Sequence, residues 1–263
     1  MITRRFYLDQ VLQVEKDFVL PLPVSHHAVR VLRMNTGQKM TLFNGDGFEY
    51  ESKIVKSDRS GTTVFIESKN EVDRESKLIS RLGLGMLKRK AMESAISRAT
   101  ELGVTEITPL STNRSNVNGS HENHWKQVIQ SSCEQCGRNQ MPGLKKISTL
   151  QAWLATTETP MRLVAHPGSK GKLKELTPEP AAVSILVGPE GGLESKEIEL
   201  ALDYGFLSVD LGRRVLRAET VPAALPRRRI TALLALLTLS MLLTIGPALR
   251  TLLTLSMLST LLT

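Results

Sequence analysis

A glycine-rich stretch, LVGPEGG at residues 186–192, follows an apolar run with the character of a strand. Its glycines let the backbone adopt torsions that are closed to other residues, and they let a ligand approach the main chain closely. Pro189 stiffens the turn, and Glu190 places a carboxylate at its apex. The stretch matches neither the GxGxxG dinucleotide fingerprint nor a phosphate-binding P-loop. Its residues alone leave two interpretations open, a cofactor-binding turn or an ordinary tight connection.

A second run, VDLGRRVLRAET at residues 209–220, is a strand-like segment that ends in a glycine and continues into two arginine-bearing turns. Both runs belong to a series of alternating strands and helices, which predicts an α/β domain with a mostly parallel sheet. Ligands bind such sheets at the carboxyl ends of strands, where LVGPEGG lies. The predicted strands cover residues 79–87, 104–112, 161–166 and 182–188, and the predicted helices cover 88–104, which Gly103 closes, 124–138 and 193–206.

The N-terminal part of the chain predicts a different architecture. MTLFNGDGFEYESKIV alternates apolar and polar residues around Asn44-Gly45 and Asp46-Gly47, the pairs that suit hairpin turns, and GTTVFIES follows as another strand. We therefore expect a small β-barrel over residues 1–70. The polar residues 71–78 have little claim to a core and predict a linker to an α/β domain over residues 79–225.

The charge balance favours a polyanionic partner. Thirty-four Lys and Arg against 26 Asp and Glu give a net charge of +8, so nucleic acid is the first partner to consider, and a solvated basic surface is the alternative. The segment HHAVRVLRMNTGQ places Arg30 and Arg33 close to two histidines. It predicts either a phosphate-binding edge of the barrel or an amphipathic segment that buries Val29 and Leu32.

Cysteine and histidine spacing gives no support for a metal site. Cys133 and Cys136 have no second pair, which argues against zinc and against a disulfide framework, and in a helix they would lie on neighbouring turns of one face. His121, His124 and His166 are too scattered to bind a metal. The N-terminus lacks the apolar core of a signal peptide, so the cytoplasm is the expected compartment.

Several motifs together resemble one family. LVGPEGGLESKEIELALDYGFLSVDLGRRVLRAET is similar to the cofactor-binding signature of the SPOUT-class methyltransferases, which use S-adenosylmethionine. KAMESAISRATELGVTEITPLSTNRSNV and EQCGRNQMP resemble the RsmE family, which methylates N3 of a uridine in the 16S ribosomal RNA of the small subunit. RRFYL and HHAVRVLRMNTGQKMTLFNGDG resemble that family's PUA-like RNA-binding barrel. The resemblance covers about residues 1–225.

The resemblance implies an α/β methyltransferase domain with a deep trefoil knot, a rare exception among folds. It also implies a homodimer in which the partner subunit completes the active site. Backbone groups of the knot loops would hold the methyl donor. Carried onto this chain, the cofactor-binding residues are Leu186, Gly188 and Gly192 in the first loop and Leu211, Gly212, Val215, Leu216 and Arg217 in the second.

Methylation of N3 requires the loss of the proton that this uracil nitrogen carries. A general base, or a cation that stabilises the uracil anion, would serve this purpose. Arg217 is our candidate for binding the base or its anion, because a guanidinium presents a rigid fork of donors to carbonyl oxygens. Glu190 and Glu219 are candidates for accepting the proton. Each glutamate has an alternative role as a helix N-cap or an ion-pair partner.

A further set of residues, all but one of them basic, are candidates for RNA contact. Arg138 and Asn139 would reach the nucleotide, and Arg114 would bind phosphate, although all three are equally suited to structural hydrogen bonds. Phosphate contacts supply salt-dependent affinity rather than sequence choice, and we expect them from Arg30, Arg33, Lys88, Arg89 and Lys90.

The chain departs from the family after Leu225. Residues 226–263 contain no acidic residue and repeat LLTLSML at 236 and 252, a bias that suggests translation in a shifted frame. The alternative is a membrane anchor, because residues 230–249 are 20 uncharged positions preceded by three arginines. We do not favour the anchor, since an RNA methyltransferase has no need of one.

The prediction is therefore a two-domain rRNA methyltransferase that uses S-adenosylmethionine and no metal. Two alternatives remain at this stage. One is an RNA-binding protein without turnover, inactivated by its altered C-terminus, and the other is a SPOUT enzyme that acts on a different RNA site.

Overall fold

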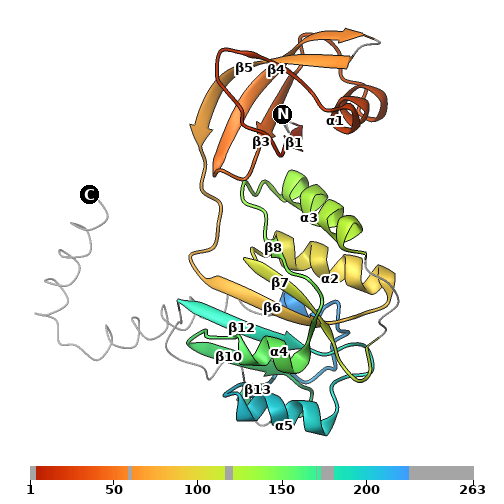
Figure 1. Ribbon diagram of the computed structural model, residues 1–263, viewed down its shortest axis with the longest axis vertical. Coiled ribbons are helices and arrows are strands. Elements are labelled where there is room, and N and C mark those ends of the chain that lie inside the picture. Colours follow the sequence, from red (N-terminus) through yellow and green to blue (C-terminus); the bar gives the residue numbers. More distant parts are fainter. Residues whose placement is uncertain (1–3, 59–60, 116–120, 170, 173–180, 225–263) are drawn as a thin grey trace, which may run out of the picture.

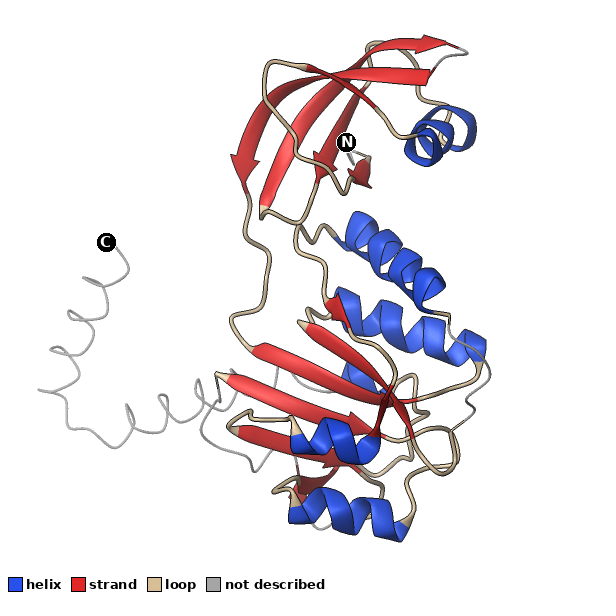
Figure 2. Cartoon of the chain, in the orientation of Figure 1, coloured by secondary structure: helices blue, strands red, loops and turns tan. Residues whose placement is uncertain are grey.

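The computed structural model describes residues 4–58, 61–115, 121–169, 171–172 and 181–224, which form two sheets joined by an extended segment (Figure 1). The N-terminal sheet comes from residues 5–71, and the parallel sheet comes from residues 79–210. Residues 72–78, within the predicted linker, contain no helix or strand. Figure 2 shows the strands of the two sheets as separate layers with helices between them and on the far side.

The N-terminal sheet has the order β1-β3-β4-β5-β2. The predicted hairpin is present between β3 and β4, and Gly45 and Gly47 in its turn have φ of 93° and 90°. Because β1 and β2 remain as edges, the described strands form an open sheet rather than the closed barrel that we predicted. The strands are β1 (Arg5–Tyr7), β2 (Asp17–Val19), β3 (Lys39–Phe43), β4 (Phe48–Asp58) and β5 (Gly61–Glu71).

A short helical segment covers one side of this sheet. It consists of α1 (Leu22–His26) and a π-helical turn, η1 (His27–Val31). Ala28 is fully buried, and Val29 and Leu32 pack against the core, whereas Arg30 and Arg33 are exposed. The segment is therefore amphipathic, as one of the two interpretations expected, and its exposed arginines leave the phosphate-binding interpretation open as well.

The second sheet is parallel at every pairing among its described strands. Its order is β11-β13-β10-β12-β6-β7-β8, with β9 also paired to β7. The alternation of strands and helices therefore predicted this architecture correctly. The strands are β6 (Ile79–Gly85), β7 (Glu106–Ser111), β8 (Gly143–Leu144), β9 (Ser148–Thr149), β10 (Met161–Ala165), β11 (Gly171–Lys172), β12 (Ala182–Val187) and β13 (Leu207–Asp210).

Helices cover both faces of the parallel sheet (Figure 1). On one face lies α2 (Arg89–Glu101), and α3 (Glu122–Cys136) packs between α2 and the N-terminal sheet. Gly103 follows α2 with φ of 86°, as expected of a glycine that ends a helix. On the other face lie α4 (Leu150–Ala155) and α5 (Ser195–Asp203), and the short α6 (Val221–Ala224) follows the last strand and contacts α2.

Within the described ranges, no helix has the length and apolar character to cross a membrane. The segment 230–249, the candidate anchor, and the whole unusual stretch 226–263 lie outside these ranges.

Candidate cofactor and RNA site

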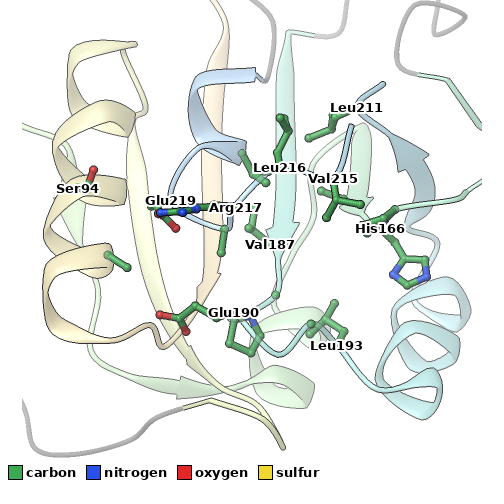
Figure 3. A pocket seen from close by; sticks show the side chains of 18 of the residues that line it. Ser94, His166, Val187, Glu190, Leu193, Leu211, Val215, Leu216, Arg217 and Glu219 are labelled. Carbon is green, nitrogen blue, oxygen red and sulfur yellow. The ribbon is translucent and has the colours of Figure 1, made fainter. Parts of the chain in front are cut away.

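A cavity of about 760 Å³ opens at the carboxyl ends of β10, β12 and β13, beside the start of α2 (Figure 3). This is the location that a parallel α/β sheet favours for a ligand. Its wall combines the loops after those strands with the α2 face and the residues leading into α6. The residues that line it are Lys88, Lys90, Ala91, Ser94, Arg98, Ala165, His166, Pro167, Val187, Gly188, Pro189, Glu190, Gly192, Leu193, Asp210, Leu211, Arg214, Val215, Leu216, Arg217, Ala218, Glu219 and Val221.

The first cavity loop, residues 188–192, is packed tightly enough to require its glycines. A Cβ atom on Gly188 would lie 2.9 Å from Leu193 Cγ and 3.0 Å from the Leu193 nitrogen. Gly192 has φ of 73°, a left-handed conformation that side chains rarely adopt. The loop also packs against the end of β6, where a Cβ on Gly85 would lie 2.8 Å from Pro189.

Neighbouring elements hold the first cavity loop by hydrogen bonds. The Glu190 carboxylate accepts the backbone N–H of Lys88 at 2.8 Å, directly before α2. Arg114 donates to the carbonyl of Gly191 at 3.0 Å and lies 3.5 Å from the Glu194 carboxylate. Arg114, one of our candidates for binding phosphate, therefore contacts the loop itself in this structure, although its side chain remains about half exposed.

The segment after β7 also fixes the start of α5. Glu194 and Glu197 form a reciprocal capping box there, in which Glu197 accepts the backbone N–H of Glu194 at 2.9 Å. Glu197 is buried and also accepts the backbone N–H of Asn113 at 2.9 Å, while the Asn113 amide donates to Glu194 at 2.9 Å. Asn113 and Arg114 thus connect the β7 end to both the loop and the helix that follows it.

The second cavity loop, residues 211–217, is more open. The Asp210 carboxylate accepts the N–H of Gly212 at 3.1 Å, and Arg98 donates to the Glu219 carbonyl at 3.2 Å. The Arg217 side chain is 86% exposed and lies 3.9 Å from the Glu219 carboxylate, which is largely buried. Figure 3 shows Arg217 and Glu219 together on the side of the cavity that faces Ser94, with His166 on the opposite side.

The predicted cofactor residues line this cavity with two exceptions, Leu186 and Gly212. Gly212 belongs to the second loop, with φ of 130°, but is not part of the wall. Leu186 is fully buried in the core beneath α4 and α5, so its side chain does not reach the cavity, and a cofactor contact through its backbone stays a prediction. Side chains alternate along a strand, and Val187, its neighbour, points to the cavity face instead.

Several wall residues were not predicted. Ala165, His166 and Pro167 follow β10, and Ser94 and Arg98 lie on the face of α2. The rule that ligands bind at the carboxyl ends of parallel strands was sufficient to find the first three, because MRLVAH was already a predicted strand. Ser94 and Arg98 lie within the KAMESAISRATELGV motif, but the resemblance of that motif did not assign either residue to the site.

Two of the predicted RNA contacts are structural in this fold. Arg138 is 5% exposed and donates to the Glu75 carboxylate and to the carbonyls of Thr100 and Val104. Asn139 is 3% exposed and donates to the carbonyl of Val72 at 2.9 Å. Both side chains are therefore committed to internal hydrogen bonds, and we correct their assignment as RNA contacts.

The other basic candidates remain available at the surface. Lys88 and Lys90 line the cavity, and Arg89 lies 3.1 Å from Glu93 on the following turn of α2 with its side chain 66% exposed. These three residues stand at the start of α2, beside the first cavity loop. They remain our candidates for phosphate contact.

The cysteines behave as parts of one helix. Cys133 and Cys136 are free thiols on neighbouring turns of α3, and burial raises the pKa of Cys133 to about 12. In the described portion of the chain, no cluster of His, Cys, Asp or Glu is arranged to hold a metal ion.

Comparison with known proteins agrees with this geometry. Residues 74–227 match the family model described as an RNA methyltransferase domain, and residues 23–67 match the RNA methyltransferase PUA domain. The ribosomal RNA small subunit methyltransferase E of Buchnera aphidicola (subspecies Schizaphis graminum) is 33% identical over 227 residues, which cover 84% of this chain and 92% of that protein.

Solved structures extend the comparison. A methyltransferase of Legionella pneumophila, determined with its cofactor S-adenosylmethionine, superimposes with a TM-score of 0.81 at 36% identity, over 90% of this chain and 97% of that one. The small subunit methyltransferase E of Neisseria gonorrhoeae, also bound to S-adenosylmethionine, gives a TM-score of 0.79 at 30% identity, over 90% and 98% of the two chains. The chain therefore belongs to the family of ribosomal RNA small subunit methyltransferase E proteins.

Proposed function

We propose that this protein transfers a methyl group from S-adenosylmethionine to N3 of one uridine in the 16S ribosomal RNA of the small subunit. One observation carries the proposal. A cavity of about 760 Å³ lies at the ends of three parallel strands, in a chain whose relatives of known structure were determined with this cofactor. Because the choice of N3 depends on the resemblance of the motifs, the chemistry has to be tested separately from cofactor binding.

The cavity suits the cofactor in size and lining. Its volume falls within the range of about 300–1,000 Å³ that small-molecule sites occupy. Leu193, Leu211 and Leu216 supply apolar surface, and the glycines of the first loop bring backbone groups close to a ligand. When bound there, S-adenosylmethionine would supply an electrophilic methyl group. The residues that we assign to hold it are Gly188, Gly192, Leu211, Val215, Leu216 and Arg217.

The protein's own contribution to the chemistry is to bind the base and remove its proton. We assign base binding to Arg217, whose exposed guanidinium extends from the cavity wall and offers a donor fork to the uracil oxygens. The Glu219 carboxylate lies 3.9 Å from the Arg217 guanidinium and is our candidate for accepting the N3 proton. Glu190 is the weaker candidate, because its carboxylate already accepts the backbone N–H of Lys88, the N-cap residue of α2.

The N-terminal sheet would hold the RNA through sequence-independent contacts. Arg30 and Arg33 are exposed on the helical segment of that sheet, and Lys88 and Lys90 stand at the cavity. Phosphate contacts from both regions would give salt-dependent affinity. We further propose a cytoplasmic homodimer in which the partner subunit completes the site, and a trefoil knot in the parallel-sheet domain.

The test is a methylation assay with small ribosomal subunits that lack the modification. The full chain is incubated with labelled S-adenosylmethionine, and the RNA is digested and analysed by mass spectrometry. We expect label in 3-methyluridine at a single position. Label at another atom or in another RNA would contradict the N3 assignment, and binding of the cofactor without transfer would support a chain that has lost turnover.

A further inference from the structure

A network of polar side chains, most of them buried, joins the N-terminal sheet to the cavity domain. At its centre are residues 137–139, which directly follow α3. Gly137 adopts φ of 87° and ends the helix, so the chain turns toward the N-terminal sheet at this point. We call Arg5, Glu49, Arg74, Glu75, Arg138 and Asn139 the junction network.

Arg138 connects the linker to the far end of α2. Its guanidinium donates to Glu75, with the shortest contact at 2.6 Å, and to the carbonyls of Thr100 at 2.8 Å and Val104 at 3.0 Å. Thr100 belongs to the last turn of α2, and the first half of the same helix supplies Lys90, Ala91 and Ser94 to the cavity wall. One rigid helix therefore links the junction to the cofactor cavity.

Asn139 and Arg5 connect the same segment to the N-terminal sheet. The carbonyl oxygen of the Asn139 side chain accepts from Arg5 at 2.6 Å, while its amide donates to the Val72 carbonyl at 2.9 Å. Arg5 lies on β1, the edge strand that packs nearest α3, and it also donates to the carbonyl of Arg138 at 3.2 Å.

Glu49 completes the network from β4. Its side chain is 11% exposed and forms ion pairs with both Arg5 and Arg74. Arg74 belongs to the linker and also donates to the Gly137 carbonyl at 2.9 Å. Burial raises the pKa of the Glu49 carboxyl, but the hydrogen bonds from Arg74 and Arg5 outweigh burial and leave the pKa below its usual value. Glu49 thus links the N-terminal sheet to the linker as a buried anion with two cationic partners.

We propose that the junction network consists of positioning residues for the methylation reaction. It fixes the angle between the N-terminal sheet and α2, so that RNA held by the sheet presents its target base to the cofactor cavity. The inference rests on the proposed function, since it assumes that the sheet binds the RNA. The junction network is remote from the reacting atoms. Its disruption should therefore weaken productive RNA binding and leave cofactor binding intact.

The test compares Glu49→Gln with Glu67→Gln in the full chain. Both variants remove one acidic charge from the N-terminal sheet, but among the residues that the structure describes Glu67 pairs with Lys39 alone, at 2.8 Å, and takes no part in the junction. The added net positive charge should, if anything, tighten RNA binding in both variants. A loss of RNA affinity confined to Glu49→Gln therefore cannot arise from charge alone. Calorimetry gives the cofactor Kd, and initial rates of methylation give kcat and the KM for small ribosomal subunits.

We expect Glu49→Gln to raise the KM for small subunits about tenfold, with kcat and the cofactor Kd unchanged, and Glu67→Gln to match the parent. Equal KM values for the two variants would overturn the proposal. If Glu49→Gln does not fold, Arg74→Gln replaces it, because the Arg74 side chain is about half exposed.

Limited proteolysis separates this proposal from the proposed function. If the parent chain methylates nothing, the proposed function is wrong, but cleavage within residues 72–78 still reports on the junction. Faster cleavage in Glu49→Gln than in Glu67→Gln supports the network as the element that holds the two parts together. Equal cleavage overturns that role.

Discussion

The first cavity loop, residues 188–192, is held by packing against β6 and by hydrogen bonds from Lys88 and Arg114. The second loop, residues 211–217, instead extends Val215 and Arg217 into solvent. Val215 is 79% exposed despite being apolar. The described hydrogen bonds to the second loop are concentrated at its two ends, at Asp210 and near Arg217.

This difference suggests a division of roles between the loops. A loop that is fixed before the ligand arrives costs little ordering entropy on binding, so the first loop is suited to set cofactor affinity. A loop with exposed apolar and cationic side chains gains contacts only when a ligand covers them. The second loop is therefore suited to couple cofactor binding to capture of the base.

The largest effect is expected from Arg217→Ala in the second loop. Removing the guanidinium should lower kcat about 100-fold and change the cofactor Kd little, because the Arg217 side chain acts on the base while the backbone of the loop holds the cofactor. Arg213→Ala is the matched control, since Arg213 is an exposed arginine of the same loop that does not line the cavity. Steady-state rates on small subunits distinguish them, and equal losses in the two variants would contradict the assignment.

Gly188→Ala should damage the first loop. The new methyl group would fall 2.9 Å from Leu193 Cγ and force the loop to shift, so we expect the cofactor Kd to rise about tenfold. Gly143→Ala is the control, because its nearest contact would be 3.9 Å away. Calorimetry measures both, and an unchanged Kd for Gly188→Ala would show that the tight packing of this loop is not needed for cofactor binding.

Arg114→Ala tests whether this arginine holds the first loop or binds phosphate. Loss of its bond to the Gly191 carbonyl should raise the cofactor Kd about fivefold, with Arg114→Lys giving an intermediate value. The opposite pattern, an unchanged cofactor Kd with a higher KM for small subunits, would favour the original phosphate-binding prediction. The two constants are measured on the same protein samples.

The smallest expected effect is a change in the hydrogen-exchange rates of the two loops. Hydrogen exchange followed by mass spectrometry should show fast exchange at residues 211–217 without cofactor and protection when S-adenosylmethionine is added. Residues 188–192 should change little, because their environment is already packed. Similar protection of both loops would remove the difference on which the comparison depends.

Local sequence patterns were sufficient to predict much of the fold. The Asn44–Gly47 turn predicted the β3–β4 hairpin, and helical spacing closed by Gly103 predicted α2. The alternating series then placed LVGPEGG at a strand end, which is where the cavity lies. These features depend on turn torsions and periodicity, which neighbouring residues determine.

The sequence was less informative where residues distant along the chain decide the position of a side chain or the pairing of a strand. Leu186 was assigned from its place in a motif; strand alternation turns its side chain to the face opposite the cavity, so the predicted contact is one through its backbone. Arg138 and Asn139 directly follow a helix, and nothing near them in sequence shows that Glu75 and Val72 lie within hydrogen-bonding distance. The closure of the N-terminal barrel likewise depends on long-range pairing, and the described strands leave it open.

The most direct test of the central claim is calorimetric titration of S-adenosylmethionine into the full chain, beside the Gly188→Ala variant. We expect saturable binding to the parent and binding about tenfold weaker in the variant. Absence of binding to the parent, or equal affinity in both proteins, would contradict the claim that the loops after β12 and β13 form the methyl-donor site.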